Sequence, residues 1–392
     1  MVTADRPRVL ILSFDAIDVD PRVIKQVRRL AVDHDVTTCA PGGQPDPRVE
    51  HVPLDPAAAR PRGRLGNLVD DVARSREWFG WSYRRLPLVQ QTTRLLRGRT
   101  FDAVLANDAE TLGAAIAVAG ADKVHADLHE FYPGLPVEDS PLGLRQRRYW
   151  TWLITRFASR VRSSTTVGQA IAERYREYGL APGVVTNAAP FRDLEPVPHT
   201  GPLRLVHSGN PFRERGLGEI MHAVAASTTD LTLDLYLTYN PPGDRAELQQ
   251  LAAQLGDRIR IHEPVAQAVL IDTLHTADLG IHVLPPTSEN NALALPNKFF
   301  DFVQARLGVI VGPSLEMARL VREHGLGVVT DGFTREDITV VLDALTPEAV
   351  AGYRRAAHAA AHALSAEAQV EVWVDAVDAI AESAGRTATE RA

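Results

Sequence analysis

The stretch from Asp278 to Pro313 constrains the fold of this chain more than any other. It opens with DLGIHVLPP, an apolar run typical of a buried parallel strand, and GVIVGP at 308–313 is typical of the next strand. Between the two runs, Pro296 suits the first position of a helix, where its fixed φ is favourable and its missing N–H is not needed. Phe299 and Phe302 follow at helical spacing. The pattern therefore predicts a strand, a polar loop, a helix and a second strand, which is one unit of a parallel α/β sheet.

The first turn of this predicted helix contains Asn297 and Lys298. Unpaired backbone N–H groups and the positive end of the helix dipole bind phosphate readily there, and a lysine adds a full charge. Asp301 lies one turn deeper on the same side, where a carboxylate can accept hydrogen bonds from sugar hydroxyls. These residues predict a phosphate site, although an ordinary βα loop with a solvated lysine fits them as well.

Strand-like and helical runs alternate along all 392 residues, a length that is too great for one hydrophobic core and fits two. The segment 191–202 carries three prolines and little periodicity, which is typical of a linker. We therefore expect an α/β protein with two doubly wound, Rossmann-like domains. Their predicted limits are 1–195 and 203–365, and a terminal helix follows at 366–385.

Composition excludes several classes of protein. The net charge of −7 gives no reason to expect a nucleic-acid partner, and the single cysteine, Cys39, rules out an intrachain disulfide and fits a reducing compartment. No run approaches the roughly 20 apolar residues of a membrane span, and the N-terminal apolar run is too short for a signal peptide. The loop after the first predicted strand, DAIDV, has no glycine, so the dinucleotide fingerprint is missing and hydride transfer is not expected. We expect a cytoplasmic protein.

Arginines and aromatic residues are interleaved between residues 74 and 99. Such a stretch can lie on an anionic membrane, or it can shield a domain or line an acceptor site with long side-chain stems. Shielding or acceptor lining is the preferred interpretation. If the stretch docks on a membrane instead, the protein is peripheral at the inner membrane face and a lipid-linked acceptor is expected.

Polar side chains end two predicted strands of the first half, at the edge where open α/β sheets bind ligands. The run FDAVLAND ends in Asn107 and Asp108, and KVHADLHE ends in His129 and Glu130. A His–Glu pair at a strand end is a candidate site, although a helix cap or a surface turn explains it better without further context. The carboxylates in the loop after the first strand are more simply loop residues than metal ligands. The acceptor-side candidates are Asp15, Asp18, Asn107, Asp108 and Glu130.

Residues 295–301, LPNKFFD, resemble the donor-site segment of retaining glycosyltransferases of the family-4 type. The resemblance implies the GT-B fold, in which two Rossmann-like domains face each other across a cleft and the last helix crosses back onto the first domain. Parts of both halves resemble this family, and the densest matches lie at 20–41, 127–130, 183–190, 208–217 and 289–312.

The activity that the resemblance implies is transfer of a hexose from a nucleotide-diphosphate sugar to a glycan, lipid-linked or small-molecule acceptor, with retention of anomeric configuration. In the family, a histidine at the place of His129 faces the donor sugar, and the acid at the place of Asp301 binds the ribose. Arg215 can contact the pyrophosphate bidentately, and with Lys298 and the helix N-terminus it would stabilise the leaving diphosphate without a metal or another cofactor. The predicted catalytic residues are His129, Arg215 and Lys298. The predicted donor-binding residues are Asn210, Arg213, Arg215, Glu289, Asn290, Asn291, Asn297, Lys298 and Asp301.

Three positions depart from the family pattern. Leu293 stands where the commoner motif has its first glutamate, Asn210 where a basic residue is expected, and Arg306 where a small residue is usual. Glu289 and Arg213 are close enough in sequence to compensate for the first two. Because of these departures, a non-catalytic nucleotide-sugar-binding partner subunit and a sugar-nucleotide epimerase or hydrolase stay open as alternatives. The sequence does not determine the donor sugar, its base, the acceptor or the oligomeric state.

Overall fold

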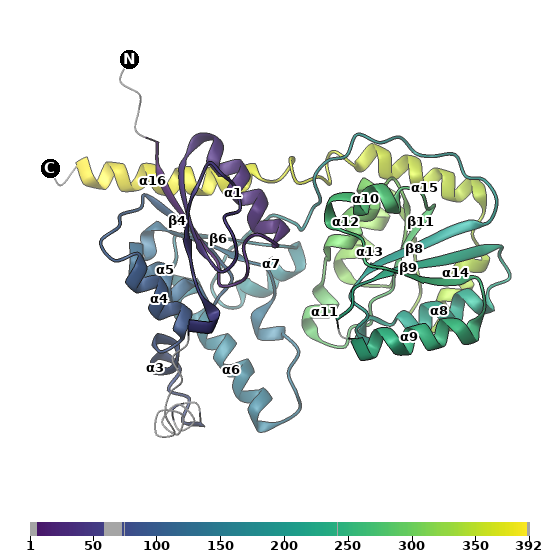
Figure 1. The fold of residues 1–392 in the computed structure, drawn as a ribbon, viewed down its shortest axis with the longest axis horizontal. Helices are drawn as coiled ribbons and strands as arrows, with labels where there is room; N and C mark the ends of the chain where they lie inside the picture. Colours follow the sequence, from purple (N-terminus) through teal and green to yellow (C-terminus); the bar gives the residue numbers. More distant parts are fainter. Residues whose placement is uncertain (1–5, 59–72, 74, 241, 390–392) are drawn as a thin grey trace, which may run out of the picture. The chain divides into compact units, whose positions relative to one another are not determined.

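The computed structural model describes residues 6–58, 73, 75–240 and 242–389 of the chain (Figure 1). The chain forms two compact units, one of Met1–Val185 with Val370–Ala392 and the other of Thr186–Gln369. Each unit contains one parallel β-sheet with helices packed on it. The predicted α/β class with two Rossmann-like domains is therefore confirmed.

The sheet of the first unit is parallel throughout, with the strand order β3-β2-β1-β4-β5-β6-β7. The order reverses between β1 and β4, and the carboxyl ends of these two neighbours form the switch point at which open α/β sheets bind ligands. The strands are β1 (Arg8–Leu12), β2 (Asp35–Ala40), β3 (Glu50–Pro53), β4 (Ala103–Asn107), β5 (Val124–Leu128), β6 (Ser163–Thr166) and β7 (Gly183–Val184).

The helices of the first unit connect these strands and pack against the sheet. The first helix begins where the sequence predicts, because Asp20 accepts hydrogen bonds from the N–H groups of Arg22 and Val23, and Pro21 occupies the first turn. The helices are α1 (Pro21–Asp33), α3 (Phe79–Arg84), α4 (Pro87–Leu95), α5 (Leu112–Ala119), α6 (Pro141–Arg156) and α7 (Gln169–Arg176), with the 3-10 turns η1 (Pro56–Ala58), η2 (Ala121–Lys123), η3 (Tyr132–Gly134) and η4 (Ala158–Arg160).

The last helix, α16 (Glu371–Thr389), belongs to the first unit although it follows the whole of the second unit in the chain (Figure 1). Its apolar stripe includes Trp373, which is 1% exposed, and Val377, which is fully buried. Both side chains lie in one core with Val27 and Leu30 of α1. The hydrophobic core of the first unit is therefore completed by the end of the chain.

The sheet of the second unit is also parallel, with the strand order β10-β9-β8-β11-β12-β13. Its order reverses between β8 and β11, so a second switch point lies at their carboxyl ends. The strands are β8 (Leu203–Gly209), β9 (Leu231–Leu237), β10 (Ile259–His262), β11 (Leu279–His282), β12 (Gly308–Val311) and β13 (Gly327–Val329).

The helices of the second unit alternate with these strands. Those on the carboxyl side of β8 and β11 carry the predicted donor-binding residues. The helices are α8 (Leu217–Ala226), α9 (Pro242–Leu255), α10 (Gln267–Leu274), α11 (Glu289–Leu293), α12 (Asn297–Gln304), α13 (Leu315–His324), α14 (Arg335–Asp343) and α15 (Pro347–Ala360), with the 3-10 turn η5 (Arg213–Arg215).

The segment before Lys298 differs from the prediction. Residues 289–293 form the separate short helix α11, which Ser288 caps by accepting a hydrogen bond from the N–H of Asn291. Pro296 is extended, with φ −79° and ψ 156°, and it precedes α12 instead of occupying its first turn. Helix α11 ends at Leu293, and Ala294 is already extended with ψ 138°. Leu295 precedes proline and is therefore disfavoured in the helical region, so the next helix starts only at Asn297.

The predicted linker 191–202 lies within the second unit, and its start is hydrogen-bonded to α12 and the residues after it. Arg306, at the end of α12, is only 1% exposed and has the left-handed φ of 60°. Its guanidinium donates hydrogen bonds to the carbonyls of Leu194 at 3.0 Å, Gln304 at 2.8 Å and Arg192. The arginine that departs from the family pattern therefore satisfies buried carbonyls and holds the connecting segment in place.

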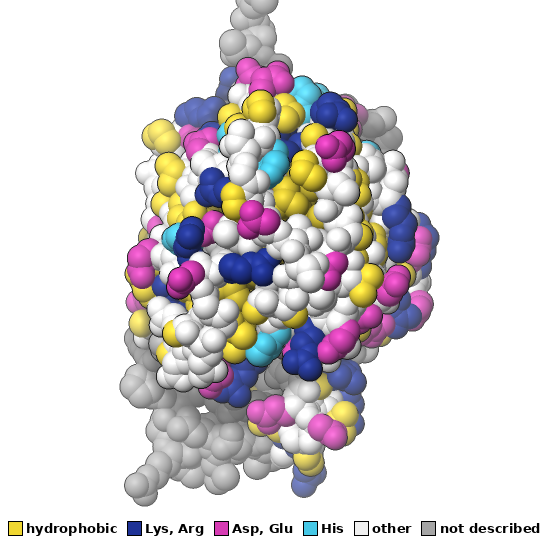
Figure 2. All heavy atoms as spheres, turned by 90° about the vertical axis from the view of Figure 1, so that its right-hand side faces the viewer, with side chains coloured by type: hydrophobic (Ala, Val, Ile, Leu, Met, Phe, Trp, Pro, Cys, Tyr) yellow, Lys and Arg dark blue, Asp and Glu magenta, His cyan; other side chains and the backbone are white. Residues whose placement is uncertain are grey.

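The surface of the second unit is mixed in character. On the face shown in Figure 2, Lys and Arg side chains are interspersed with Asp and Glu, and apolar side chains lie in small groups among them. A search of the described helices finds none whose length and apolar character would allow it to cross a bilayer.

Candidate functional site

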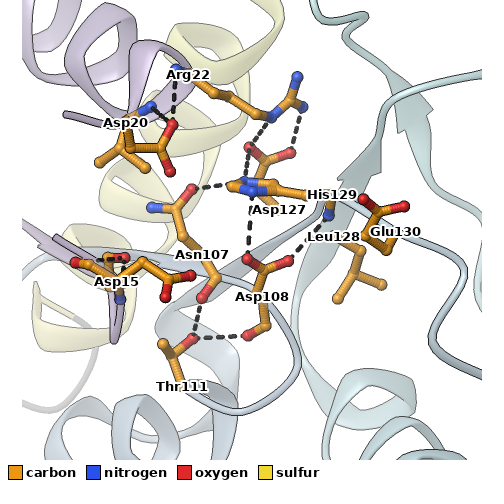
Figure 3. Close-up of polar contacts among 12 residues, drawn as sticks. Asp15, Asp20, Arg22, Asn107, Asp108, Thr111, Asp127, Leu128, His129 and Glu130 are labelled. Carbon is orange, nitrogen blue, oxygen red and sulfur yellow. Dashed lines mark hydrogen bonds and ion pairs between the residues drawn. The ribbon is translucent and has the colours of Figure 1, made fainter. Parts of the chain in front are cut away.

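The switch point of the first unit brings together polar residues from the ends of β4 and β5 (Figure 3). Asp108 follows β4 with the left-handed φ of 68°, a conformation that costs energy in a residue other than glycine. This turn lets the Asp108 N–H donate to the carbonyl of Asp127 at 2.8 Å, and it directs the Asp108 carboxylate at the residue that follows β5. The carboxylate accepts the backbone N–H of His129 at 3.1 Å.

Both ring nitrogens of His129 face acceptors. Nδ1 lies 3.2 Å from Oδ2 of Asp108, and Nε2 lies 3.2 Å from Oδ1 of Asn107 and 3.4 Å from Oδ2 of Asp127 (Figure 3). An imidazole between acceptors on both sides is best satisfied with a proton on each nitrogen. Burial lowers the pKa of His129, but the carboxylates of Asp108 and Asp127 outweigh burial and raise it to about 9. His129 is therefore a fixed imidazolium at neutral pH.

Asp127 is the buried hub of this cluster. Its carboxylate accepts two hydrogen bonds from Arg22 of α1, from Nε at 2.8 Å and from Nη2 at 2.7 Å. Gln26 of α1 and Thr165 of β6 add bonds of 2.6 Å and 2.7 Å. Burial raises the pKa of Asp127, but Arg22 and then His129 outweigh burial and hold the pKa well below its usual range. Asp127 therefore stays ionised and keeps the imidazole in position.

The remaining acceptor-side candidates lie around this cluster with different partners. Asp15 is exposed but close enough to add to the pKa of Asp108, which burial raises and His129 lowers. Asp18 instead accepts a hydrogen bond from the N–H of Gly43 at 3.0 Å, so it stabilises a neighbouring loop. Glu130 is exposed, and its carbonyl accepts a hydrogen bond from a buried tyrosine. The structure thus joins Asn107, Asp108 and His129 directly and places Asp15 beside them.

Part of the basic aromatic stretch packs against another helix of the first unit. The ring of Phe79 lies 5.5 Å from that of Tyr149, and the ring of Tyr83 lies 5.1 Å from that of Phe157, so the aromatic side chains of α3 pack against α6 and the turn after it. Trp78 is 54% exposed, whereas Arg74 lies outside the described residues. For these rings, the structure favours the interpretation that the stretch shields a domain.

The switch point of the second unit holds two basic side chains, those of Lys298 and Arg215. Lys298, in the first turn of α12, places Nζ 3.2 Å from Nε2 of His207 on β8. Burial lowers the pKa of Lys298, the nearby Arg215 lowers it further against the opposing charge of Asp301, and the result is about 7. Within the described parts of the chain, no ion pair is formed by either Lys298 or Arg215. Two basic side chains that form no ion pair among the described residues, at a helix N-terminus, make this edge of the sheet suited to an anion.

The backbone at this edge is shaped to fit the lysine. Gly209, at the end of β8, has φ 126°, and a Cβ at this position would lie 2.9 Å from Nζ of Lys298. Gly216 has φ 70°, and a Cβ there would approach Pro285 to 3.1 Å. Glycine at both positions therefore lets the loop with Arg215 pass close to Lys298.

The other predicted donor-binding residues differ in burial and in their partners. Asp301 and Asn290 are buried, whereas Glu289 and Asn297 are exposed at the first positions of α11 and α12. The three remaining side chains, those of Asn291, Asn210 and Arg213, are bonded to neighbouring residues. Asn291 donates to Thr287, Asn210 accepts from Thr238, and Arg213 pairs with Asp244 and Glu247. Arg213 is thus neutralised by two carboxylates instead of adding charge beside Lys298.

Several residues of both clusters were not identified from the sequence. Arg22 and Gln26 are polar residues on the buried face of α1, and Asp127 lies inside a strand, so only their partners reveal their role. His207 and His282 interrupt apolar strand runs, which was a signal that the sequence offered. For the residues that the structure describes, no group of three or more His, Cys, Asp or Glu side chains is arranged to hold a metal ion.

One protein family matches part of the chain. Residues 22–195 match the family model described as Glycosyltransferase Family 4. No curated protein matches the sequence.

Solved structures resemble the whole chain in fold. α,α-Trehalose 6-phosphate synthase from Burkholderia multivorans is 12% identical, with a TM-score of 0.69 and coverage of 98% of both chains. Anabaena Alr3699/HepE in complex with UDP and glucose is 15% identical, with a TM-score of 0.69 and coverage of 95% of this chain and 100% of that one. Sucrose-phosphate synthase from Thermosynechococcus elongatus is 11% identical, with a TM-score of 0.68 and coverage of 98% and 99%.

Proposed function

We propose that this chain is a glycosyltransferase of the family-4 type with the GT-B fold, and that it moves a hexose from a nucleotide-diphosphate sugar to an acceptor, with retention of anomeric configuration and without a metal ion. The observation that carries the proposal is the pair of cations at the second switch point. Arg215 and Lys298 lie close together without a neutralising ion pair among the described residues, at the N-terminus of α12. A diphosphate supplies the charge that this site lacks.

The chemical problem in such a transfer is the charge of the leaving group. As the bond between the anomeric carbon and the diphosphate oxygen breaks, the diphosphate gains negative charge. The guanidinium of Arg215, the ammonium of Lys298 and the N–H groups of α12 are placed to stabilise that charge. We therefore expect turnover in the presence of a metal chelator.

Retention requires the acceptor to approach from the face that the diphosphate leaves. In the proposed reaction, the acceptor hydroxyl oxygen bonds to the anomeric carbon and its proton passes to the departing phosphate oxygen. This scheme needs neither a protein nucleophile nor a protein base. We assign His129 to the donor sugar, a role supported by its fixed imidazolium and by the family resemblance.

The first donor to test is a UDP-sugar. The structures similar in fold include Anabaena Alr3699/HepE with UDP and with UDP-glucose. Adenosine, guanosine and thymidine diphosphates with their glucose conjugates complete the panel. They are included because Arg215 and Lys298 bind the diphosphate and do not distinguish one base from another.

The proposal predicts selective stabilisation by one nucleoside diphosphate. A ligand that binds only the folded protein raises Tm in a concentration-dependent way, so a thermal-shift panel with and without Mg²⁺ measures it directly. Lys298→Ala and Arg215→Ala should each abolish the shift and lower turnover by roughly 100-fold or more, while the circular dichroism spectrum stays unchanged.

A matched control is available on the same unit. Arg335 of α14 is exposed and pairs with the exposed Glu336 at 2.7 Å, so Arg335→Ala removes one arginine without touching the proposed site. The shift should persist in this variant. If no diphosphate changes Tm, the assignment as a nucleotide-sugar transferase is wrong. A shift without turnover on any acceptor would instead identify a nucleotide-sugar-binding partner subunit.

Peripheral contact with the cytoplasmic face of a membrane would give the protein access to a lipid-linked acceptor. Trp78 is the exposed aromatic side chain of the described part of the 74–99 stretch, and Arg84 and Arg85 follow it closely. Cosedimentation with anionic vesicles, compared between the wild type and Trp78→Ala, decides whether this surface docks.

A further inference from the structure

Two histidines lie behind Lys298 in the interior of the second unit. His207 of β8 is fully buried and His282 of β11 is 1% exposed, and their ring centroids are 5.3 Å apart. Nδ1 of His207 lies 2.7 Å from the carbonyl oxygen of Ile281. A carbonyl can only accept, so Nδ1 carries the hydrogen and Nε2 of the same ring is left as an acceptor.

The ammonium of Lys298 is held by that free acceptor. Nζ of Lys298 lies 3.2 Å from Nε2 of His207, which makes a neutral imidazole the hydrogen-bond partner of the lysine. Burial first, and the charge of Lys298 second, hold the pKa of His207 and of His282 well below the usual value for histidine. Neither histidine can therefore compete with Lys298 for charge at neutral pH.

The groups that face Lys298 come from four elements. They are His207 of β8, His282 of β11, Arg215 of η5 and Asp301 of α12 itself. His282 has no hydrogen-bond partner on either ring nitrogen among the described residues, so it contributes no bond to the ammonium. Arg215 opposes the lysine charge and Asp301 supports it. His207 is thus the neutral contact that fixes the position of the Lys298 side chain.

We propose that His207 is a positioning residue for the diphosphate of the donor: the acceptor Nε2 of its imidazole holds the side chain of Lys298 in the place where phosphate oxygens bind. The inference rests on the proposed function, because the diphosphate site is the one formed by Arg215 and Lys298. A carboxylate in place of His207 would keep the proton on Lys298, but the ion pair would cancel the positive charge that the diphosphate needs. A neutral imidazole orients the side chain and leaves its charge for the phosphate oxygens.

The coupling has a definite sign. In the empty protein Lys298 loses its proton as the pH rises through about 7, whereas the bound diphosphate keeps the proton on the lysine to a higher pH. Above pH 7 each binding event therefore takes up close to one proton, and the association constant of UDP should fall by about tenfold per pH unit, the limit for one linked proton.

The lysine can be observed directly because the chain has few of them. Its lysines are Lys25, Lys123 and Lys298, so protein labelled with ¹³Cε-lysine gives one signal for each. The signal that disappears in Lys298→Arg belongs to Lys298, and the other two serve as references. In the empty wild-type protein this signal should titrate near pH 7, and with saturating UDP its midpoint should lie more than one pH unit higher. A midpoint near that of ordinary lysine in the empty protein would overturn the proposal.

Variants of the two histidines separate positioning from packing. His207→Leu removes the acceptor, so Lys298 should titrate at lower pH and the Kd of UDP should rise about tenfold at pH 7. His207→Gln places a side-chain oxygen near the position of Nε2 and should restore most of both properties. His282→Leu is the matched control, since it changes an adjacent buried ring that makes no bond, and it should leave the Lys298 midpoint unchanged. An unchanged midpoint in His207→Leu would show that the histidine only fills space.

Calorimetry in two buffers of different ionisation enthalpy completes the test. At pH 8 the wild type should take up close to one proton per UDP, and Lys298→Arg should take up none because arginine remains charged. Binding of UDP without proton uptake by the wild type would contradict the inference. Failure of UDP to bind at all would count against the proposed donor class, whereas the titration of empty wild-type and His207→Leu proteins would still decide the role of His207.

Discussion

At the scale of single residues, the first unit places a charged histidine and a charged aspartate side by side in its interior. Asp127 is fully buried and Arg22 is 5% exposed, yet both remain ionised because each satisfies the other through two hydrogen bonds. Such a pair contributes little net stability when intact, but breaking one half leaves the other charge buried without a partner. The same carboxylate also fixes Nε2 of His129, so stability and site geometry depend on one side chain.

The first prediction concerns this pair. Asp127→Asn should lower the free energy of unfolding by about 3–5 kcal/mol, because the guanidinium of Arg22 stays buried without its counter-charge. Urea denaturation of the wild type and the variant measures the difference.

The control for this prediction is an ion pair on the surface, in which the distance between the charged atoms is similar. Arg319 and Glu323 are 48% and 54% exposed and lie 2.6 Å apart, so Glu323→Gln should cost less than about 1 kcal/mol. The double variant Arg22→Met with Asp127→Asn should recover part of the loss. Equal costs for Asp127→Asn and Glu323→Gln would show that the buried pair has no special role.

At the scale of elements, α12 has a function at each end. Its first turn carries Lys298, and Arg306 just after its last turn holds the segment that enters the unit. The three phenylalanines between them, Phe299, Phe300 and Phe302, are fully buried and keep the helix against β11 and β12. The packed middle of the helix therefore positions a lysine that is unfavourable for folding, as functional residues often are.

The prediction at this scale is that Lys298→Met stabilises the empty protein. The unfolded chain keeps the lysine proton up to about 10.5, whereas the folded protein releases it near 7. The cost of the lysine is therefore fully present below pH 7 and declines as the pH rises from 7 toward 10.5. The gain in Tm should be larger at pH 6 than at pH 9, which differential scanning calorimetry can measure without any nucleotide.

A comparison within the same protein controls for the loss of a basic side chain. Arg335→Met changes an exposed residue whose partner Glu336 is also exposed, and it should leave Tm nearly constant at both pH values. A Lys298→Met variant that is less stable than the wild type at pH 6 would contradict the low pKa on which the further inference also depends.

At the scale of the whole molecule, the two units are not consecutive in sequence. The first unit needs α16, whose Trp373 lies 4.8 Å below the guanidinium of Arg22 and donates a hydrogen bond to Thr165 at 3.3 Å. Thr165 and Arg22 are both partners of Asp127. The end of the chain therefore supports the network around His129 as well as the core of the first unit.

The prediction at this scale is that Trp373→Ala destabilises the first unit selectively. Truncation of a fully buried tryptophan costs about 3–5 kcal/mol. Hydrogen exchange should show lost protection in α1, β1 and β4, whereas β8, β11 and β12 keep theirs. Val372→Ala, a change at an exposed neighbour on the same helix, should alter neither set. Equal loss of protection in both units would show that α16 does not belong to the first unit alone.

The sequence by itself determined the features that depend on neighbours along the chain. The alternation of apolar strand runs with helical spacing predicted two α/β sheets, and the Asp20–Pro21 pair predicted the start of α1. Lys298 was identified because it opens a helix after a strand, whereas Arg215 was identified through the resemblance of residues 208–217 to the glycosyltransferase family. Caps, periodicities and helix starts are local properties, so a single sequence is enough to reveal them.

The tertiary structure alone decided which distant residues meet. Asp127 receives Arg22 from 105 positions away, and Lys298 receives His207 from 91 positions away, because the strand order of each sheet places their elements side by side. The terminal helix packs in the core of the first unit, although the sequence of the whole second unit lies between them in the chain. The periodicity of a sequence predicts that a residue is buried, but it does not predict which strand the residue will lie beside. The ionisation of His129 and Lys298 follows from partners that only the folded arrangement supplies.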